Sequence, residues 1–480
     1  MSMTDLRDDK PMWGIGEVLA LSWPAGLSML NSTLMRFVDA ILVAQLGPDT
    51  SGAQFIAGMT AFVPESLATG MLLVVNTYVS QNFGAGRHQR CGRYAWAGLY
   101  LALGFCCLIA PLALFARPLF ACYGHPPHLQ DMEVLYFRYM VVSIFFTLTS
   151  RPLEQFFYGI GRPRVVLAAS LVANGLNLLG DIVLIFGKLG FPALGLEGAA
   201  IATTISWGVL VTIELLFFLS GAMNARYATR RVRSARWSDC MDLIRIGWPA
   251  GVQFINDVLP WAVFTGKIVN IFGVQHFVAS TVAMRWMPLS FMPAVGIGVA
   301  STTLVGRYIA RGRPDLACRR AHAALIAGMV YMGLCGLAFW LLRYPMMKLF
   351  VTLPGVADLT AAQMQQYADE VIRIGGSVLI CAAIFQLGDA IGIVYIGALR
   401  GAGDTLWPMT ATVILSWCLT IGGGYAMAGL LPSLGSIGPW IAASAYVIVL
   451  GVFVAWRFET GAWQKINLLG SGDQGLGRRD

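Results

Sequence analysis

The chain alternates between long apolar stretches and short segments that hold charged residues, glycine or proline. Two of the apolar stretches, residues 94–116 and 405–456, contain no Asp, Glu, Lys or Arg at all. Because roughly 20 apolar residues cross the hydrocarbon core of a bilayer, such stretches predict membrane-spanning helices. The longer stretch exceeds one crossing, and the segment LPSLG at residues 431–435 supplies the turn that divides it.

The pattern as a whole predicts an all-α polytopic membrane protein with twelve transmembrane helices. The predicted helices cover residues 14–44, 53–83, 94–116, 132–159, 165–187, 195–222, 241–272, 276–306, 318–343, 366–399, 405–430 and 437–457. Lys and Arg collect on the cytoplasmic loops of membrane proteins. With the amino terminus in the cytoplasm, 23 of the 33 basic residues fall on inner segments, six on outer segments and four within helices. The asymmetry predicts that both termini are cytoplasmic and that the chain lies in the cytoplasmic (inner) membrane.

Internal similarity divides the chain into two halves. The segment WPAG at residues 23–26 recurs at residues 248–251, and TYVSQNFGAGR at residues 77–87 is echoed by TLVGRYIARGR at residues 303–313. Six crossings return the chain to its starting side, so the halves are parallel, and parallel halves around a central cavity suit alternating access. The predicted divisions are a cytoplasmic tail (1–13), a six-helix N-lobe (14–222), a basic cytoplasmic linker (223–240), a six-helix C-lobe (241–457) and a cytoplasmic tail (458–480).

Composition excludes several classes of protein. Of the 480 residues, 57% are hydrophobic and 12% charged, against about 25% charged in soluble domains, which argues against a soluble enzyme, a disordered chain or a nucleic-acid-binding protein. The net charge of +8 reflects the basic loops, so no nucleic-acid partner is expected. We find no Ser/His/Asp, HExxH or Walker lysine pattern, and we therefore expect neither enzymatic activity nor a cofactor.

Charged side chains inside the predicted helices are the candidate functional groups, because each costs about 2.5–3.5 kcal/mol near the bilayer centre. In the first half these are Arg36, Asp39 and Asp181. Asn177 lies four residues before Asp181, on the same helical face. With Thr203 as a nearby hydroxyl, these side chains offer oxygen ligands for Na⁺ or another small cation, or a proton site. The alternative is that Arg36 and Asp39 simply neutralise each other.

The second half contains its own buried charges. Asp257 and Asp389 are the acids, and Lys267 and Arg285 are potential counter-ions that would modulate them or pair with them structurally. Three further acids, Glu65, Glu154 and Glu214, lie nearer to helix ends, where long side chains can extend to water. We interpret those three as structural.

The motifs resemble the multidrug and toxic compound extrusion (MATE) family over about residues 14–457. The similar segments are FVDAILVAQLG, NTYVSQNFGAGR, GIGRPRVVLAASLVANGLNLLGDIVL, GLEGAAIAT and GALRGAGDT. The resemblance implies a secondary antiporter that exports organic, often cationic, compounds in exchange for Na⁺ or H⁺, which is the coupling ion. The implied partners are small organic substrates and the lipid bilayer, and the expected state is a monomer.

The resemblance also implies two ion sites. Asp39, Asn177, Asp181 and Thr203 match the N-lobe cation site of relatives, where Na⁺ is the expected metal. Asp257 and Asp389 match the C-lobe acids, while Arg36 and Lys267 depart from the family pattern. The alternative function is a flippase for lipid-linked precursors on a related two-lobe fold, which a cavity lined by Arg36, Lys267 and Arg285 would favour.

Overall fold

The computed structural model describes residues 14–232, 236–350 and 361–469, and within these ranges it contains helices and turns but no β-strand. The first half forms α1 (Ile15–Ala44), α2 (Pro48–Leu72), α3 (Val74–Gly84), α4 (His88–Ile109), η2 (Ala110–Ala113), α5 (Ala116–Ala121), α6 (Pro127–Gly159), α7 (Pro163–Phe186), α8 (Leu196–Phe218) and α9 (Gly221–Tyr227). The second half forms α10 (Trp237–Asn256), α11 (Leu259–Val263), η3 (Phe264–Ile268), η4 (Val269–Phe272), α12 (Val274–Met284), α13 (Met287–Ala310), α14 (Pro314–Leu341), α15 (Arg343–Phe350), α16 (Ala361–Ala402), α17 (Leu406–Leu415), η5 (Ser416–Gly422), α18 (Gly423–Leu430), η6 (Pro432–Leu434), α19 (Ile437–Glu459) and η7 (Ala462–Lys465).

Eleven helices in the described part of the chain are long and apolar enough to cross a membrane. The seventh predicted helix, residues 241–272, is the one that is missing from these eleven. Its first part, α10, ends at Asn256, a turn follows at Asp257 and Val258, and α11 starts again one residue before Pro260. Proline cannot donate the backbone hydrogen bond that a continuous helix needs, so the crossing is built from two pieces.

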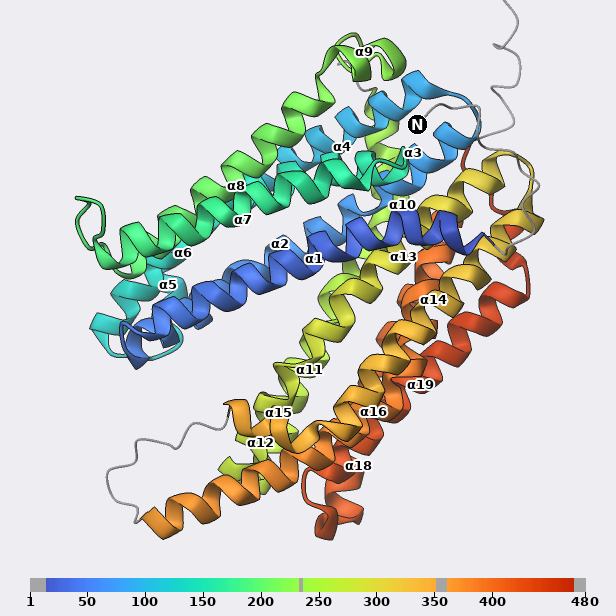
Figure 1. The fold of residues 1–480 in the computed structure, drawn as a ribbon. Helices are drawn as coiled ribbons and strands as arrows, with labels where there is room; N and C mark the ends of the chain where they lie inside the picture. Colours follow the sequence, from blue (N-terminus) through green and yellow to red (C-terminus); the bar gives the residue numbers. More distant parts are fainter. Residues whose placement is uncertain (1–13, 233–235, 351–360, 470–480) are drawn as a thin grey trace, which may run out of the picture.

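The helices form two arms that meet at one end and diverge toward the other (Figure 1). The first arm contains α1 to α8, and the second contains α12 to α19. Both arms start from the region of α3, α9 and α10, where the arginine-bearing turns after α3 and α13 also lie. We call this the arginine-rich end. The two-lobe architecture predicted from the internal repeat is confirmed.

Close backbone contact holds the arms together near their junction. A β-carbon added to Gly70 in α2 would lie 2.6 Å from the carbonyl oxygen of Ala250 and 2.8 Å from the Cα of Gly251, both in α10. Gly26 in α1 approaches Pro293 in α13 in a similar way, and its added β-carbon would lie 3.0 Å from the Pro293 carbonyl oxygen. Small residues allow membrane helices to approach in this way. Each of these two helix–helix contacts joins one helix of the first lobe to one helix of the second.

Polar contacts close the arginine-rich end. Arg93 in α4 donates two hydrogen bonds of 2.7 Å to the carboxylate of Asp239 in α10. At the other crossing, Glu17 in α1 accepts hydrogen bonds from Arg320 (2.8 Å) and Tyr308 (3.0 Å) of the second lobe. These pairs must break before the lobes can separate at this end.

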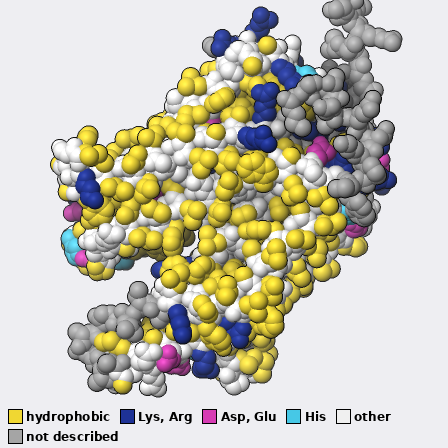
Figure 2. Space-filling view, in the orientation of Figure 1, with side chains coloured by type: hydrophobic (Ala, Val, Ile, Leu, Met, Phe, Trp, Pro, Cys, Tyr) yellow, Lys and Arg dark blue, Asp and Glu magenta, His cyan; other side chains and the backbone are white. Residues whose placement is uncertain are grey.

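Away from the junction the arms enclose a notch, which the space-filling view shows (Figure 2). A ring contact between Phe37 in α1 and Phe350 in α15, with centroids 5.8 Å apart, bridges the two lobes on that side. Hydrophobic side chains cover both arms (Figure 2), and large ones such as Leu108, Leu179 and Phe55 are exposed. Such a surface is expected to face lipid.

We predict that Gly70→Ala destabilises the junction by about 1–3 kcal/mol, because the new methyl group meets backbone atoms that cannot rotate away. The measurement is the apparent melting temperature of the purified protein in detergent. Gly58→Ala, on the same helix with nothing within 4 Å of the added carbon, is the matched control and should leave that temperature unchanged or raise it, since alanine favours helix by about 1 kcal/mol. Equal behaviour of the two variants would contradict the close-packing interpretation.

Candidate functional site

The predicted N-lobe residues come together in the structure. Asp39 in α1 and Asp181 in α7 interact through their carboxyl groups, and Thr203 in α8 lies with its hydroxyl 3.5 Å from Asp39 Oδ2. Asn177 lies one turn before Asp181 in α7. Asp181 is 0% exposed and Asn177 is 1% exposed. Three helices therefore contribute one compact polar cluster to the interior of the first lobe.

This cluster is short of hydrogen-bond partners. Within the described residues, Asp39 Oδ1, both carboxyl oxygens of Asp181 and Asn177 Nδ2 are buried without one. Buried polar groups in proteins are nearly always paired, and an isolated buried carboxylate is strongly unfavourable. The oxygen-rich donor set therefore fits a small cation or a proton as the missing partner.

Tyr136 in α6 is a member of this cluster that sequence reasoning missed. Its hydroxyl interacts electrostatically with both Asp39 and Asp181 and pairs with Gln54 of α2. A single tyrosine in an apolar helix gives no sequence signal of its own. Only the packing of α6 against the other helices brings it to the acids.

Arg36 does not form an ion pair with Asp39 in the described structure. The strongest electrostatic interaction of its guanidinium is with Glu65, followed by those with Arg151 and Asp39. Arg36 is also accessible at the surface of the lobe. The cluster around Asp39 and Asp181 thus keeps its own unsatisfied negative groups.

The structure corrects our interpretation of two of the three glutamates near helix ends. Glu154 in α6 is 8% exposed and Glu214 in α8 is 0% exposed, so neither extends to water. They lie against each other and against Arg151 because α6 and α8 pack side by side. The expectation that side chains near helix ends extend to water was wrong for these two residues, because other helices cover the ends at which they lie.

The C-lobe acids also lie in one region. Asp257 occupies the turn between α10 and α11, where its side chain is accessible, and it interacts electrostatically with Asp389 of α16. Tyr446 in α19 faces both acids. The break in the seventh helix therefore lies at one of the two acids.

Arg400 is the counter-charge at Asp257, although sequence reasoning did not single it out. It lies inside α16, two residues before the last residue of that helix, and interacts with Asp257. The predicted counter-ions lie elsewhere. Lys267 is accessible within the π-helical turn η3, and Arg285 stacks on Phe350 at 5.7 Å from the ring centroid. In the described residues neither forms an ion pair with Asp257 or Asp389.

Irregular helix surrounds the C-lobe acids. A second π-helical turn, η5, follows α17 and packs against α11 and η3. Asn256, next to Asp257, donates a hydrogen bond of 2.9 Å to Ser416 at the start of η5 and accepts one of 3.0 Å from Trp417. π-Helical turns are frequent at functional sites because they redirect side chains.

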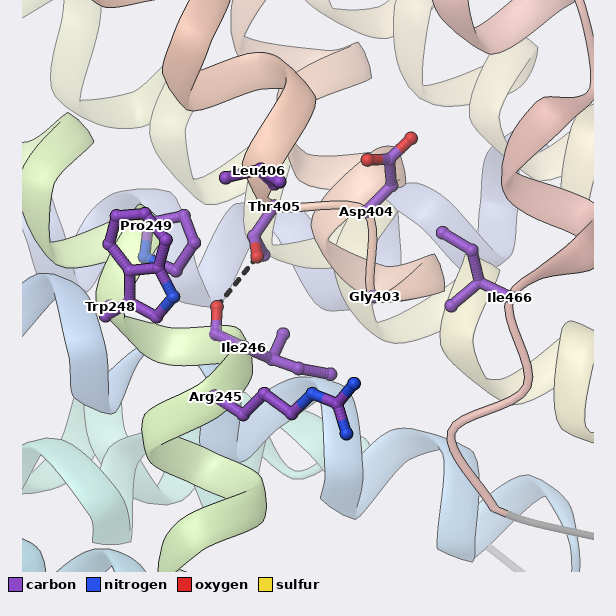
Figure 3. Close-up of a pocket in the computed structure, with 9 residues that line it drawn as sticks. All are labelled: Arg245, Ile246, Trp248, Pro249, Gly403, Asp404, Thr405, Leu406 and Ile466. Carbon is purple, nitrogen blue, oxygen red and sulfur yellow. Dashed lines mark hydrogen bonds between the residues drawn. The ribbon is translucent and has the colours of Figure 1, made fainter.

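A pocket of about 340 Å³ lies between α10 and the start of α17 at the arginine-rich end. In the close-up (Figure 3), the Thr405 hydroxyl donates a 2.7 Å hydrogen bond to the Ile246 carbonyl, and Arg245 and Trp248 line the space. None of the four predicted aspartates lines it. The pocket is therefore separate from both acid clusters.

Comparison with known proteins places these features in a family context. The family described as MatE matches residues 24–183 and 258–426 of the chain. The chain is 29% identical over 443 residues to the multidrug resistance protein NorM of Burkholderia vietnamiensis, covering 92% of both chains. It is 25% identical over 456 residues to a probable NorM of Thermotoga maritima, covering 94% of this chain and 93% of that one.

Solved structures share the fold. A MOP superfamily transporter from Pyrococcus furiosus superposes with a TM-score of 0.84 at 20% identity, covering 94% of this chain and 97% of the other. The Vibrio cholerae MATE transporter VcmN, solved as a point mutant, gives a TM-score of 0.82 at 19% identity, covering 95% and 98%.

We predict that binding of a cation or a proton at the N-lobe cluster stabilises the purified protein. A ligand at 100 times its dissociation constant adds about 2.7 kcal/mol to the free energy of unfolding. The apparent melting temperature should therefore rise on adding Na⁺ or on lowering the pH. Asp181→Asn removes one of the unpaired carboxylates and should reduce that rise. Asp315→Asn, on the exposed start of α14, should keep it. An Asp181→Asn protein with the full rise would show that the ion binds elsewhere.

Proposed function

The chain belongs to the MatE family, and from this premise we propose that it is a secondary antiporter that exports organic cations in exchange for Na⁺ or H⁺. As a member of a transporter family it is not an enzyme. The names of its NorM relatives, which are multidrug resistance proteins, support export of varied organic compounds. The observation that carries the proposal is the buried N-lobe cluster, in which three of the four carboxylate oxygens of Asp39 and Asp181 have no hydrogen-bond partner in the described structure.

Coupling follows from the chemistry of the carboxylates. A cationic substrate and a coupling ion both compensate the same negative charge, so each weakens the binding of the other. Asp39, Asn177, Asp181 and Thr203 supply the N-lobe ion site in this proposal, and Asp257 and Asp389 supply the C-lobe site. The ion drives transport only if it binds the two arrangements of the lobes with different affinities.

The junction supports alternating access as the mechanism. In the arrangement seen here the lobes are closed at the arginine-rich end, which we assign to the cytoplasm because basic residues collect there. Opening that end requires the Glu17–Arg320 and Arg93–Asp239 pairs to break. The described arrangement thus corresponds to the state that releases substrate to the outside, and a monomer is sufficient for the cycle.

Lipid flipping remains the alternative function that the proposal has to exclude. Its expected feature is a basic cavity, but each candidate ion site is built around a pair of acids, and Arg285 stacks on Phe350 instead. Growth assays separate the two activities. Overexpression should raise resistance to toxic organic cations, whereas an envelope defect on deletion, without any change in resistance, would favour flipping.

We predict that Asp39→Asn and Asp181→Asn each reduce ethidium transport in membrane vesicles at least tenfold. An amide carries no negative charge that a proton, Na⁺ or a cationic substrate could compensate. Asp257→Asn and Asp389→Asn should reduce it as well if both lobes couple. The measurement is ethidium fluorescence after a Na⁺ or a pH gradient is imposed separately. Asp315→Asn should transport normally, and intact efflux in all four site variants would refute the assignment.

A further inference from the structure

The first lobe contains a second charged cluster, distinct from the Asp39–Asp181 site. Glu214 of α8 packs against Ser150, Arg151 and Glu154 of α6. Thr203, which belongs to the first site, precedes Glu214 by eleven residues on the same helix, or about 16 Å at 1.5 Å per residue. The two clusters therefore lie at different depths of the lobe.

The two contacts that the Ser150 hydroxyl makes with Glu214 and Glu154 need two protons, and the hydroxyl supplies only one. The hydroxyl oxygen of Ser150 lies 2.8 Å from Glu214 Oε2 and 3.3 Å from Glu154 Oε1. A serine hydroxyl carries a single proton, and an ionised carboxylate only accepts. If both glutamates were ionised, one of the two contacts would bring two oxygens together without a proton between them.

The position of the counter-charge identifies which glutamate carries that proton. Arg151 donates a 2.8 Å hydrogen bond to Glu154 Oε2 and so compensates the charge of Glu154. Glu214 has no cation of its own in the described structure. Its side chain is fully buried, and its second oxygen, Oε1, has no hydrogen-bond partner. A lone carboxylate in that position is strongly disfavoured, whereas a neutral acid is tolerated.

Among the described residues, no further cation compensates the charge of Glu214. The titratable groups that face it are Glu154, Arg151 and Tyr158, all on α6. The other helices packed on α8 carry charged groups that interact elsewhere. Asp181 of α7 interacts with Asp39, Arg36 of α1 interacts with Glu65, and Arg226 of α9 stacks on the rings of Phe83 and Tyr227. With a proton on Glu214, the arrangement is a linear chain in which Glu214 donates to Ser150, Ser150 donates to Glu154, and Glu154 pairs with Arg151.

This chain also connects toward the first site. Thr147 of α6 donates a 2.7 Å hydrogen bond to Glu65 of α2, and Glu65 interacts with both Arg151 and Arg36. Arg36 in turn interacts with Asp39. Charges of alternating sign therefore run from Glu154 through Arg151, Glu65 and Arg36 to Asp39.

We propose that Glu214 is a second proton-binding site of the N-lobe, which holds its proton in the lobe arrangement seen here through the Ser150 relay to the Arg151–Glu154 pair. The ligand is a proton from water, and the only bond that forms or breaks is the O–H bond of the Glu214 carboxyl group. Loss of that proton adds a negative charge to the network that ends at Arg36 and Asp39. The site can exist whether or not the chain performs antiport, so its test is independent of transport.

The test is infrared difference spectroscopy on the full-length purified protein at neutral pH, in H₂O and in D₂O. We expect a C=O stretching band of a buried, protonated carboxylic acid that disappears in Glu214→Gln and remains in Asp181→Asn. Glu197→Gln is the matched control, since Glu197 lies on the same helix and accepts a 2.7 Å hydrogen bond from Tyr139. It should leave the band unchanged.

Ser150→Ala provides a second, independent measurement, because it leaves both glutamates in place. Removal of the acceptor for the Glu214 proton should shift the band to higher wavenumber rather than abolish it. This variant decides the matter if Glu214→Gln does not fold. A wild-type spectrum without such a band, or a band that neither Glu214→Gln nor Ser150→Ala changes, would overturn the proposal. Loss of ethidium efflux in the aspartate variants would bear only on the antiport function.

Discussion

The cost of placing charge away from water governs the arrangement of this protein. A carboxylate or guanidinium in the membrane interior has to find a counter-charge, a proton or a bound ion. The chain keeps most of its basic residues on connecting segments, where water solvates them. The few charges that remain inside are gathered into clusters, and each cluster is held by at least two helices. The lobes are therefore built around these groups as well as around their apolar cores.

The two lobes resolve that constraint differently. In the first lobe, Asp39 and Asp181 face each other with unsatisfied oxygens, while Arg151 compensates Glu154 in a separate cluster at another depth. In the second lobe, Asp257 lies in a helix break and interacts with Arg400. A site with a cation close to one of its acids gains less from an added cation than a site with free oxygens. This difference favours the first lobe as the primary ion site in the proposed cycle.

Contact between the lobes is made of two kinds of interaction with different roles. Glycine contacts such as that of Gly70 with α10 are short and rigid, so they define how the helices cross. Ion pairs such as Arg93 with Asp239 lie at the arginine-rich end and can be exchanged for water. A rocking motion can thus break the polar contacts while the packed crossings act as the pivot, which is the behaviour expected of parallel lobes around a central site.

The sequence by itself determined the helices, the two lobes and the residues of the N-lobe cluster. Apolar length sets where helices cross a bilayer, and i, i+4 spacing puts Asn177 and Asp181 on one face, so these features are local and can be read along the chain. The cost of burying charge singled out Asp39, Asp257 and Asp389 as well, and the family resemblance grouped the acids into two ion sites. The tertiary structure alone decided the partners of the charges: Tyr136 beside the N-lobe acids, Arg400 rather than Lys267 beside Asp257, and buried Glu154 and Glu214 where helix ends suggested exposure. Pairing depends on which faces of distant helices pack together, and no spacing within one helix contains that information.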